Sequence, residues 1–255
     1  METEDAIRAW LPLVLATVFI VLLSTIPMPI WLLAPTVLGM AYLIYVQVFH
    51  TQLLAKSFWL STYLRSDSPI RLYLRRSVLL RWIAAIISLP LALLTYISVY
   101  GYGIWDCMAV CTAIFAAKRA HATISSPVDA NVAEHLIELA HIRIYYWFAI
   151  FFVLAALALV SIAESFAIDY ASITGDQIAT QTIEEIKHPV RFIRHCSRTL
   201  RFSELQLLRV RDINGGPYGW LIYLFFLIPN ALPAFGLVTL FAGLERLAHS
   251  AKVLE

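Results

Sequence analysis

Six apolar runs separated by polar segments dominate the pattern of this chain. A helix needs about 20 mostly apolar residues to cross the hydrocarbon core of a bilayer, and most of these runs approach that length. The pattern therefore predicts an all-α fold: a polytopic α-helical membrane protein with about six transmembrane helices, in one membrane domain over residues 1–255. The predicted spans are residues 10–26, 30–50, 78–96, 104–118, 144–163 and 218–243.

The fourth run, residues 104–118, is short enough to dip into the bilayer and return, which would leave five spans. The five-span and six-span topologies can be compared by counting the Lys and Arg residues on each side, because cytoplasmic loops are enriched in both residues. Six spans with both ends cytoplasmic place eleven of these residues inside and seven outside, whereas five spans place thirteen inside and five outside. Gly101 and Gly103 favour six spans, since they predict a tight turn into a separate crossing.

The polar segments are expected to form short amphipathic helices at the membrane surface. These segments are residues 51–77, 119–143 and 165–217. The second is predicted to be helical in its second half, with Asp129 as the cap. In the third, residues 169–182 are expected to form a loop with a turn at Gly175, followed by a basic helix over residues 189–202. Ser203 and Gln206 then form a capping-box pattern, which predicts a separate short helix.

The last apolar run carries Pro229 and Pro233 near its centre, with Asn230 between them. Proline cannot donate a hydrogen bond to the carbonyl four residues earlier, so the carbonyls of Phe225 and Pro229 lose their helical partners. We expect a break in this span at about the mid-depth of the bilayer, where a neighbouring helix, the Asn230 amide, water or a cation satisfies these oxygens. The alternative is a packing kink that is satisfied locally.

Composition places the chain in lipid, because 60% of its residues are hydrophobic and only 14% are charged. A net charge of +2 gives no reason to expect a nucleic-acid partner. The cysteines Cys107, Cys111 and Cys196 have the spacing of neither a disulfide framework nor a zinc site. The first run follows an acidic start and has no Ala-x-Ala cleavage pattern, so we expect it to be retained as a span. The expected location is a bacterial inner (cytoplasmic) membrane.

Asp106 and Glu164 are the acidic residues nearest to the hydrocarbon, where an ionised group is costly unless it faces a partner or water. We predict that they attract a cation toward the broken helix, and the alternative is that both are simply solvated at headgroup level. The predicted ion or substrate pathway consists of Asp106, Glu164, Asn230, Pro229 and Pro233. Gln47 and His50, at the end of the second span, are expected to form interhelical hydrogen bonds.

Two Glu-x-x-His motifs occur, Glu138 with His141 and Glu185 with His188. In di-iron bundles this spacing places a carboxylate and an imidazole on one helix face. The fifth predicted span separates the two motifs, so they should lie on opposite sides of the membrane, and Pro189 disfavours helical geometry at His188. We expect no metal site and no cofactor, with a di-iron or haem site on these four residues as the alternative.

A basic face is predicted on the helix over residues 189–202. The arginines at helical spacing are Arg191, Arg194, Arg198 and Arg201. Such a face binds anionic lipid headgroups or an acidic partner, and a helix that is merely solvated is the alternative.

These features favour a small oligomeric transporter or ion-conducting protein, surrounded by membrane lipids and assembled as a homo-oligomer or membrane complex. One alternative is a non-catalytic membrane scaffold or sensor subunit that docks a partner or anionic lipid through the basic helix. A membrane di-iron or haem enzyme is a further alternative. The chain has no Ser/His/Asp arrangement, phosphate loop or dinucleotide fingerprint, which makes an enzyme the less favoured class.

Overall fold

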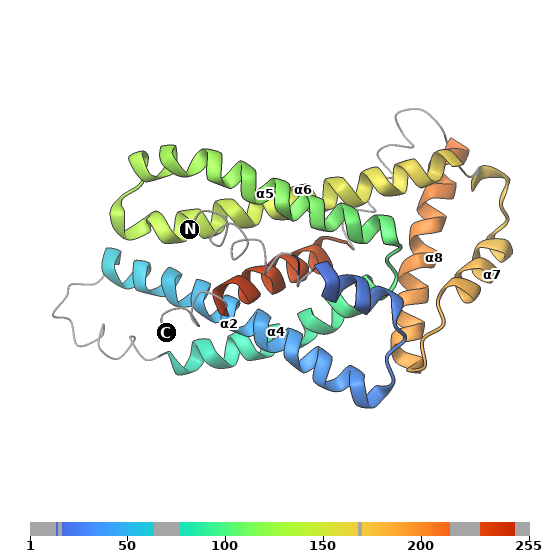
Figure 1. Cartoon of the computed structure of the whole chain (residues 1–255), viewed down its shortest axis with the longest axis horizontal. Helices are drawn as coiled ribbons and strands as arrows, with labels where there is room; N and C mark the ends of the chain where they lie inside the picture. The colour runs from blue at the N-terminus through green and yellow to red at the C-terminus, as the bar shows by residue number, and fades with distance from the viewer. Residues whose placement is uncertain (1–13, 15–16, 64–76, 168–169, 215–229, 248–255) are drawn as a thin grey trace.

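The computed structural model describes residues 14, 17–63, 77–167, 170–214 and 230–247, and every element in these ranges is helical. The α-helices are α2 (Ile30–Tyr63), α4 (Val78–Tyr100), α5 (Ile104–Asn131), α6 (Ile137–Ala167), α7 (Gly175–Glu185) and α8 (Arg191–Asn214) (Figure 1). Short 3₁₀ turns cover Glu134–Leu136 and Tyr170–Ser172. Residues 17–25 and 230–247 are also helical. The predicted all-α fold is therefore confirmed for the described residues.

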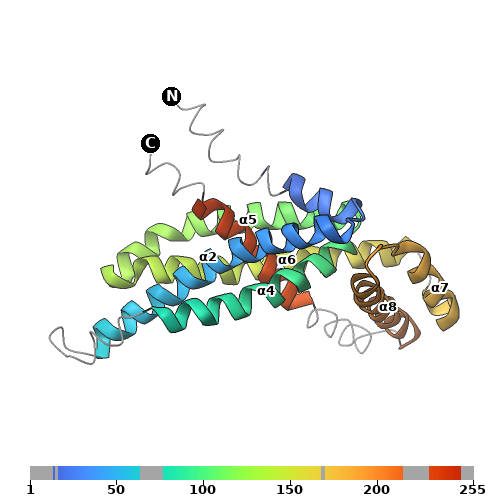
Figure 2. The same cartoon turned by 90° about the horizontal axis from the view of Figure 1, so that it is seen from below.

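Four long helices form two pairs that lie side by side, α2 with α4 and α5 with α6 (Figures 1 and 2). The two helices of each pair run antiparallel (Figure 1). The helical segment 230–247 lies between the two pairs, and its side chains form part of their shared core. Helices α7 and α8 lie at one end of this bundle, with α8 running across the direction of the long helices.

Within the described part of the chain, three helices are long and apolar enough to cross a membrane: Ile30–Tyr63, Val78–Tyr100 and Ile137–Ala163. This finding agrees with a membrane-integral protein, but the number is smaller than the five or six spans that the sequence predicted. Two of the predicted spans, 10–26 and 218–243, lie partly outside the described residues. Helix α5 falls short because Asp106, Lys118 and Arg119 interrupt its apolar character.

The helices extend well beyond the predicted spans, because an apolar run marks the part of a helix suited to lipid and not the ends of its backbone hydrogen bonding. The second span was predicted to end at residue 50, but α2 continues to Tyr63. Helix α5 is one continuous helix of 28 residues beside α6, so residues 104–118 do not turn back as the five-span threading requires. Asp129 lies near the end of α5, and its prediction as a helix cap is wrong.

Two similar capping patterns had opposite outcomes in residues 170–214. The predicted loop with a turn at Gly175 is in fact the start of α7, where the Thr174 hydroxyl accepts from the Gln177 amide and the Gln177 side chain accepts from the Thr174 amide. By contrast, Ser203 opens no new helix, because α8 is continuous from Arg191 to Asn214. The Ser203 hydroxyl instead donates to the carbonyl of Thr199, four residues earlier (2.8 Å).

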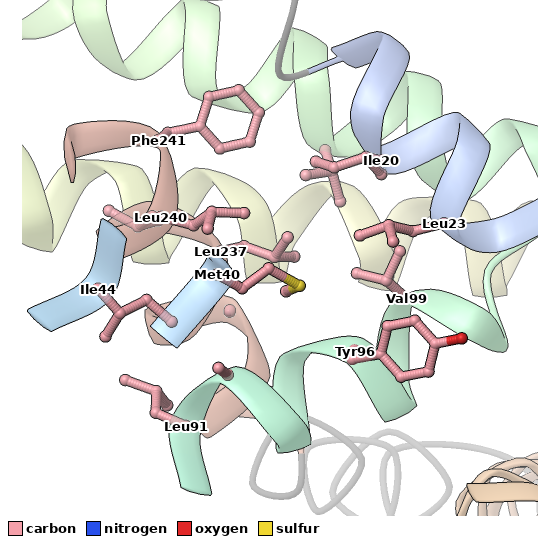
Figure 3. Packing of buried hydrophobic residues seen from close by; sticks show 14 of the residues in the cluster. Ile20, Leu23, Met40, Ile44, Leu91, Tyr96, Val99, Leu237, Leu240 and Phe241 are labelled. Atoms are coloured by element: carbon pink, nitrogen blue, oxygen red, sulfur yellow. The ribbon is translucent and has the colours of Figure 1, made fainter. Parts of the chain in front are cut away.

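Segment 230–247 packs closely enough on its neighbours to require glycine at two positions. A Cβ atom at Gly243 would clash with the backbone carbonyl of Leu43 on α2, and one at Gly236 would clash with the Thr95 hydroxyl on α4. Small residues allow such close backbone approach between membrane helices. Figure 3 shows the resulting core, in which Leu237 and Leu240 lie near Met40 and Ile44 of α2.

The bundle has two ends, which we name by what lies there. The α8 end holds α7, α8 and the turn at Gly101–Gly103, and the network end holds the connection between α5 and α6 and the last residues of segment 230–247. Exposed tryptophans occur toward both ends, as in the aromatic belts of membrane proteins. They are Trp31 and Trp105 toward the α8 end, and Trp59, Trp82 and Trp147 toward the network end.

Candidate functional site

Arg246 is the centre of a polar network that joins three helical elements at the network end. Its Nη1 donates to Gln47 Oε1 on α2 (3.3 Å), and its Nη2 donates to His50 Nε2 one turn later (2.7 Å). Glu138 on α6 places Oε1 3.5 Å from both Arg246 Nη2 and His50 Nε2. Because arginine only donates, His50 accepts at Nε2 and is neutral. The interhelical hydrogen bonds expected for Gln47 and His50 are thus confirmed.

A second ion pair, between Lys118 of α5 and Glu245, lies beside this network. Glu245 and Arg246 are consecutive, so the end of segment 230–247 is tied to α5 by one residue and to α2 and α6 by the next. The side chains of Lys118, Glu245 and Arg246 are partly buried among apolar helices, where an unpaired charge would be costly. Pairing therefore fixes this end of the segment in the bundle.

Three further residues form a hydrogen-bonded chain between α5 and α6. His141 Nε2 donates to Asp129 Oδ1 (2.7 Å), and His141 Nδ1 lies 3.1 Å from His121 Nε2. Burial lowers the pKa of His121, and the neighbouring His141 lowers it further. Because the proton of the neutral His141 ring lies on Nε2, its Nδ1 accepts from His121 Nε2, and the three side chains form one hydrogen-bonded chain from the exposed Asp129 to His121.

These groups surround an open pocket of about 770 Å³ at the network end. Its polar lining residues are Gln47, Lys118, His121, Glu138, His141, Tyr145, Glu245 and Arg246. The Tyr145 hydroxyl is buried and has no hydrogen-bond partner among the described residues. A pocket of this size with several converging polar groups is typical of small-molecule sites, and an unsatisfied buried hydroxyl indicates room for a ligand or water.

The structure places the predicted pathway residues at the other end. Asp106 Oδ2 accepts from the Gly103 amide (2.9 Å) and so completes the N-terminal cap of α5. Asn230 lines a pocket of about 240 Å³ together with Tyr102 and Arg201, level with the turn between α4 and α5. The side chain of Glu164, which lies inside α6, and the whole of Pro229 fall outside the described residues.

The predicted break at mid-depth rests on the carbonyls of Phe225 and Pro229, which lie outside the described residues. Pro233 is buried within a segment that is helical from residue 230 to residue 247, and Asn230 lies at the end of the bundle.

The two Glu-x-x-His motifs lie at opposite ends of the bundle, as predicted. Glu138 and His141 belong to the network end, whereas Glu185 pairs with Arg201 and His188 contacts α4 at the α8 end. The chain also leaves the helix before His188, because α7 ends at Glu185. Among the described residues, no group of three or more His, Cys, Asp or Glu side chains is arranged to hold a metal ion.

Among the described residues, two of the four arginines of the predicted basic face bond to α7 or a carboxylate, and the other two do not. Arg198 donates through Nε to the Ile186 carbonyl (3.0 Å) and through Nη2 to the Ile183 carbonyl (2.9 Å), which caps the C-terminus of α7. Arg201 forms ion pairs with Glu185 and Glu204. Arg191 and Arg194 form no ion pair within the described residues. Half of the predicted face therefore holds α7 and α8 together.

His188 joins the α7–α8 unit to the bundle, a role that the sequence did not suggest. Its side chain is buried, its Nδ1 accepts from the Val190 amide (3.0 Å), and its Nε2 lies 3.0 Å from the Tyr96 hydroxyl. Since Nδ1 accepts, the neutral ring carries its proton on Nε2 and donates it to Tyr96. Burial lowers the pKa of His188, and the positive charge of Arg194 lowers it further.

Two more hydrogen bonds support this junction. Tyr100 donates its hydroxyl proton to the Lys187 carbonyl (2.9 Å), and Ser197 of α8 donates to the Ile97 carbonyl of α4 (3.0 Å). The Ile97 carbonyl is available because the Gly101 amide bonds to Ser98 in the tight turn that ends α4. The α8 end is thus a structural junction built mainly from neutral groups.

No protein-family model matches the chain, and neither the characterised proteins nor the solved structures compared with it show a significant match. The site therefore has to be interpreted from its own geometry. Sequence reasoning missed the network because it treated each charge by itself. The available signal was that Lys118, Glu245 and Arg246 each follow directly after an apolar run on the same predicted side of the membrane.

Proposed function

We propose that this chain is an integral membrane transport protein that takes up a small hydrophilic solute through the pocket at the network end. The pocket carries the proposal, because it collects two cationic and two acidic side chains and two imidazoles from three helical elements. Ionisable groups at the edge of a membrane bundle are costly, so their convergence on an open pocket favours a functional role. The mixture of charges suits a solute with both donors and acceptors.

The His121–His141–Asp129 chain supports proton-linked uptake. It begins at an exposed carboxylate and ends at a side chain that lines the pocket, so a proton can reach a bound solute without crossing the bundle. We further propose six crossings, including residues 10–26 and 218–243, with the network end in the cytoplasm of a bacterial inner membrane. The excess of Lys and Arg predicted for this side supports that orientation. A homo-oligomer is part of the proposal and is checked by the mass of the protein in detergent.

The test compares Glu138→Gln with Glu134→Gln in reconstituted vesicles. Glu134 lies in the connection before α6 and does not line the pocket, so it controls for the loss of one carboxylate. Amino acids, polyamines and dicarboxylates are first screened for a shift in the thermal unfolding midpoint. The stabilising compound is then followed as a radiolabelled substrate, with internal pH reported by pyranine. We expect Glu138→Gln to reduce uptake and the coupled pH change at least tenfold, and Glu134→Gln to leave both unchanged. Equal uptake by the two variants would refute the assignment.

A scaffold that docks a partner through α8 is the second candidate function. The observation that favours it is that Arg191 and Arg194 form no ion pair within the described part of the chain, while Phe192 between them is exposed. Charge reversal of both arginines to Glu would abolish capture of an acidic partner and leave solute uptake intact. The pathway roles predicted for Asp106 and Asn230 stay predictions, and Asp106→Asn in the same flux assay tests them.

A further inference from the structure

A third pocket, of about 530 Å³, lies at the α8 end between two segments that are far apart in sequence. On one side are Pro27 and Pro29, in the turn that precedes α2, and on the other are residues of the connection between α7 and α8 and of α8 itself. The charged residues that line this pocket are Lys187, Arg194 and Arg198, and no acidic residue from the described ranges lines it. The pocket is therefore strongly positive.

The three cations differ in how they are engaged. Arg198 is committed to the carbonyls of Ile183 and Ile186, so it contributes charge while it holds α7 in place. Arg194 is only partly exposed, and neither it nor Lys187 forms an ion pair within the residues that the structure describes. A partly buried arginine without a counter-ion is costly, and an anion in the pocket would remove that cost.

The surroundings of the pocket indicate where such an anion would come from. Trp31, at the start of α2, is 71% exposed, and Phe192, at the start of α8, is 58% exposed. Exposed tryptophan at the end of a candidate membrane helix is typical of the headgroup region of a bilayer. The anions that are concentrated at this level are the phosphates of phospholipid headgroups.

We propose that the pocket formed by the Pro27–Pro29 turn, Lys187, Arg194 and Arg198 binds the phosphate of an anionic phospholipid headgroup. The proposal is independent of the solute pocket, which lies at the opposite end of the bundle. The lipid would link the start of α2 to α8, two elements that the described hydrogen bonds do not join directly. Its phosphate would supply the missing counter-charge for Arg194 and Lys187.

The test measures lipid retention by native mass spectrometry of the full chain, released from nanodiscs that contain phosphatidylglycerol and phosphatidylcholine. The test variant is Lys187→Gln/Arg194→Gln, which leaves the structural Arg198 intact. The control is Arg119→Gln/Arg143→Gln, which removes the same charge from two exposed positions toward the network end. Because each cation near an anionic surface contributes roughly a fivefold factor, we expect the test variant to retain phosphatidylglycerol ~30-fold less well. The control should retain it as the unmodified chain does.

Three results would overturn the proposal: equal losses in the two double variants, equal retention of phosphatidylcholine, or displacement of the lipid by millimolar inorganic phosphate, which would indicate a site for the free anion. Circular dichroism checks that the test variant remains folded. Arg194→Lys, which keeps the charge, should retain phosphatidylglycerol to within about threefold, and a loss as large as that of the double variant would also count against the proposal.

Discussion

The two ends of the bundle are both closed by polar contacts, yet the contacts differ in charge and exposure. At the network end, ion pairs made by Lys118 and Arg246 join helices around an open pocket. At the α8 end, the hydroxyls of Tyr96 and Ser197 bond to neutral, buried groups. Charged groups beside open space can exchange a protein partner for a solute, whereas a buried neutral bond has only the partner that the fold provides. The comparison favours the network end for the proposed solute exchange, whereas the described bonds at the α8 end attach α8 to α4.

The largest effect is expected in segment 230–247, which connects the two ends. Gly243→Ala forces a Cβ atom against the backbone of Leu43, which cannot move away without shifting α2, and we expect a loss of about 3 kcal/mol in the free energy of unfolding. Gly236→Ala should cost less, because its obstacle is the Thr95 side chain, which can rotate. Both are measured as unfolding midpoints in detergent.

Gly39→Ala is the matched control, since a Cβ atom at Gly39 meets nothing within 4 Å. It should be neutral or stabilising by up to about 1 kcal/mol, because alanine has the higher helix propensity. If Gly243→Ala proved as stable as Gly39→Ala, the packing of segment 230–247 on α2 would be disproved, and with it the link between the ends.

A smaller effect is expected from the charges of the network end. Arg246→Ala leaves Glu138 without its cationic partner and removes a donor from Gln47 and His50. We expect a loss of about 2 kcal/mol, less than for a fully buried pair because Arg246 retains some exposure. A double-mutant cycle with Glu138→Gln measures the coupling. Additive losses in that cycle would show that the two residues do not interact, contrary to the network described above.

The smallest effect is expected from the neutral junction at the α8 end. Tyr96→Phe removes the acceptor of the His188 Nε2 proton and should cost about 1 kcal/mol. His188 also makes the stability of this end depend on pH. Its pKa in the folded protein lies below the ordinary value of about 6.5, so its contribution is complete above that pH and is lost as the pH falls through the lowered pKa.

We therefore expect the thermal unfolding midpoint to decrease as the pH is lowered from 7.5 to 5. The decrease should be smaller in His188→Gln. The pKa of His121 is lowered as well, so His121→Gln separates the contribution of the network end. If the unfolding midpoint decreased equally in the unmodified chain and in His188→Gln, His188 would not be the source of the pH dependence.

The sequence predicted the apolar parts of the helices well, because they follow from hydropathy alone, but not where the helices end. The contrast between Thr174 and Ser203 shows why. Both begin a pattern typical of a capping box, yet Thr174 caps α7 while Ser203 lies inside α8, and only the packing of α8 on α4 distinguishes them. A local pattern states that a cap is possible, and tertiary contacts decide whether it is used.

The candidate site was harder to predict than the fold because its residues come from four separate elements. His50 was expected to form an interhelical bond, but its partner Arg246 is 196 residues away, and nothing local connects the two. Asp106 drew attention as an acid near hydrocarbon, although its carboxylate mainly caps α5. The sequence shows which charged residues lie near hydrocarbon and need a partner. Which residue becomes that partner depends on how the helices pack.

The adjacency of Glu245 and Arg246 has a consequence for how the protein is made. Lys118 on α5 pairs with Glu245, and Gln47 on α2 bonds to Arg246. Both helices are synthesised early, so they gain these partners only after residue 246 has been added to the chain. We therefore expect the two helix pairs to close on each other only after these residues are made, and a chain interrupted before residue 245 to leave Lys118 without this ion pair.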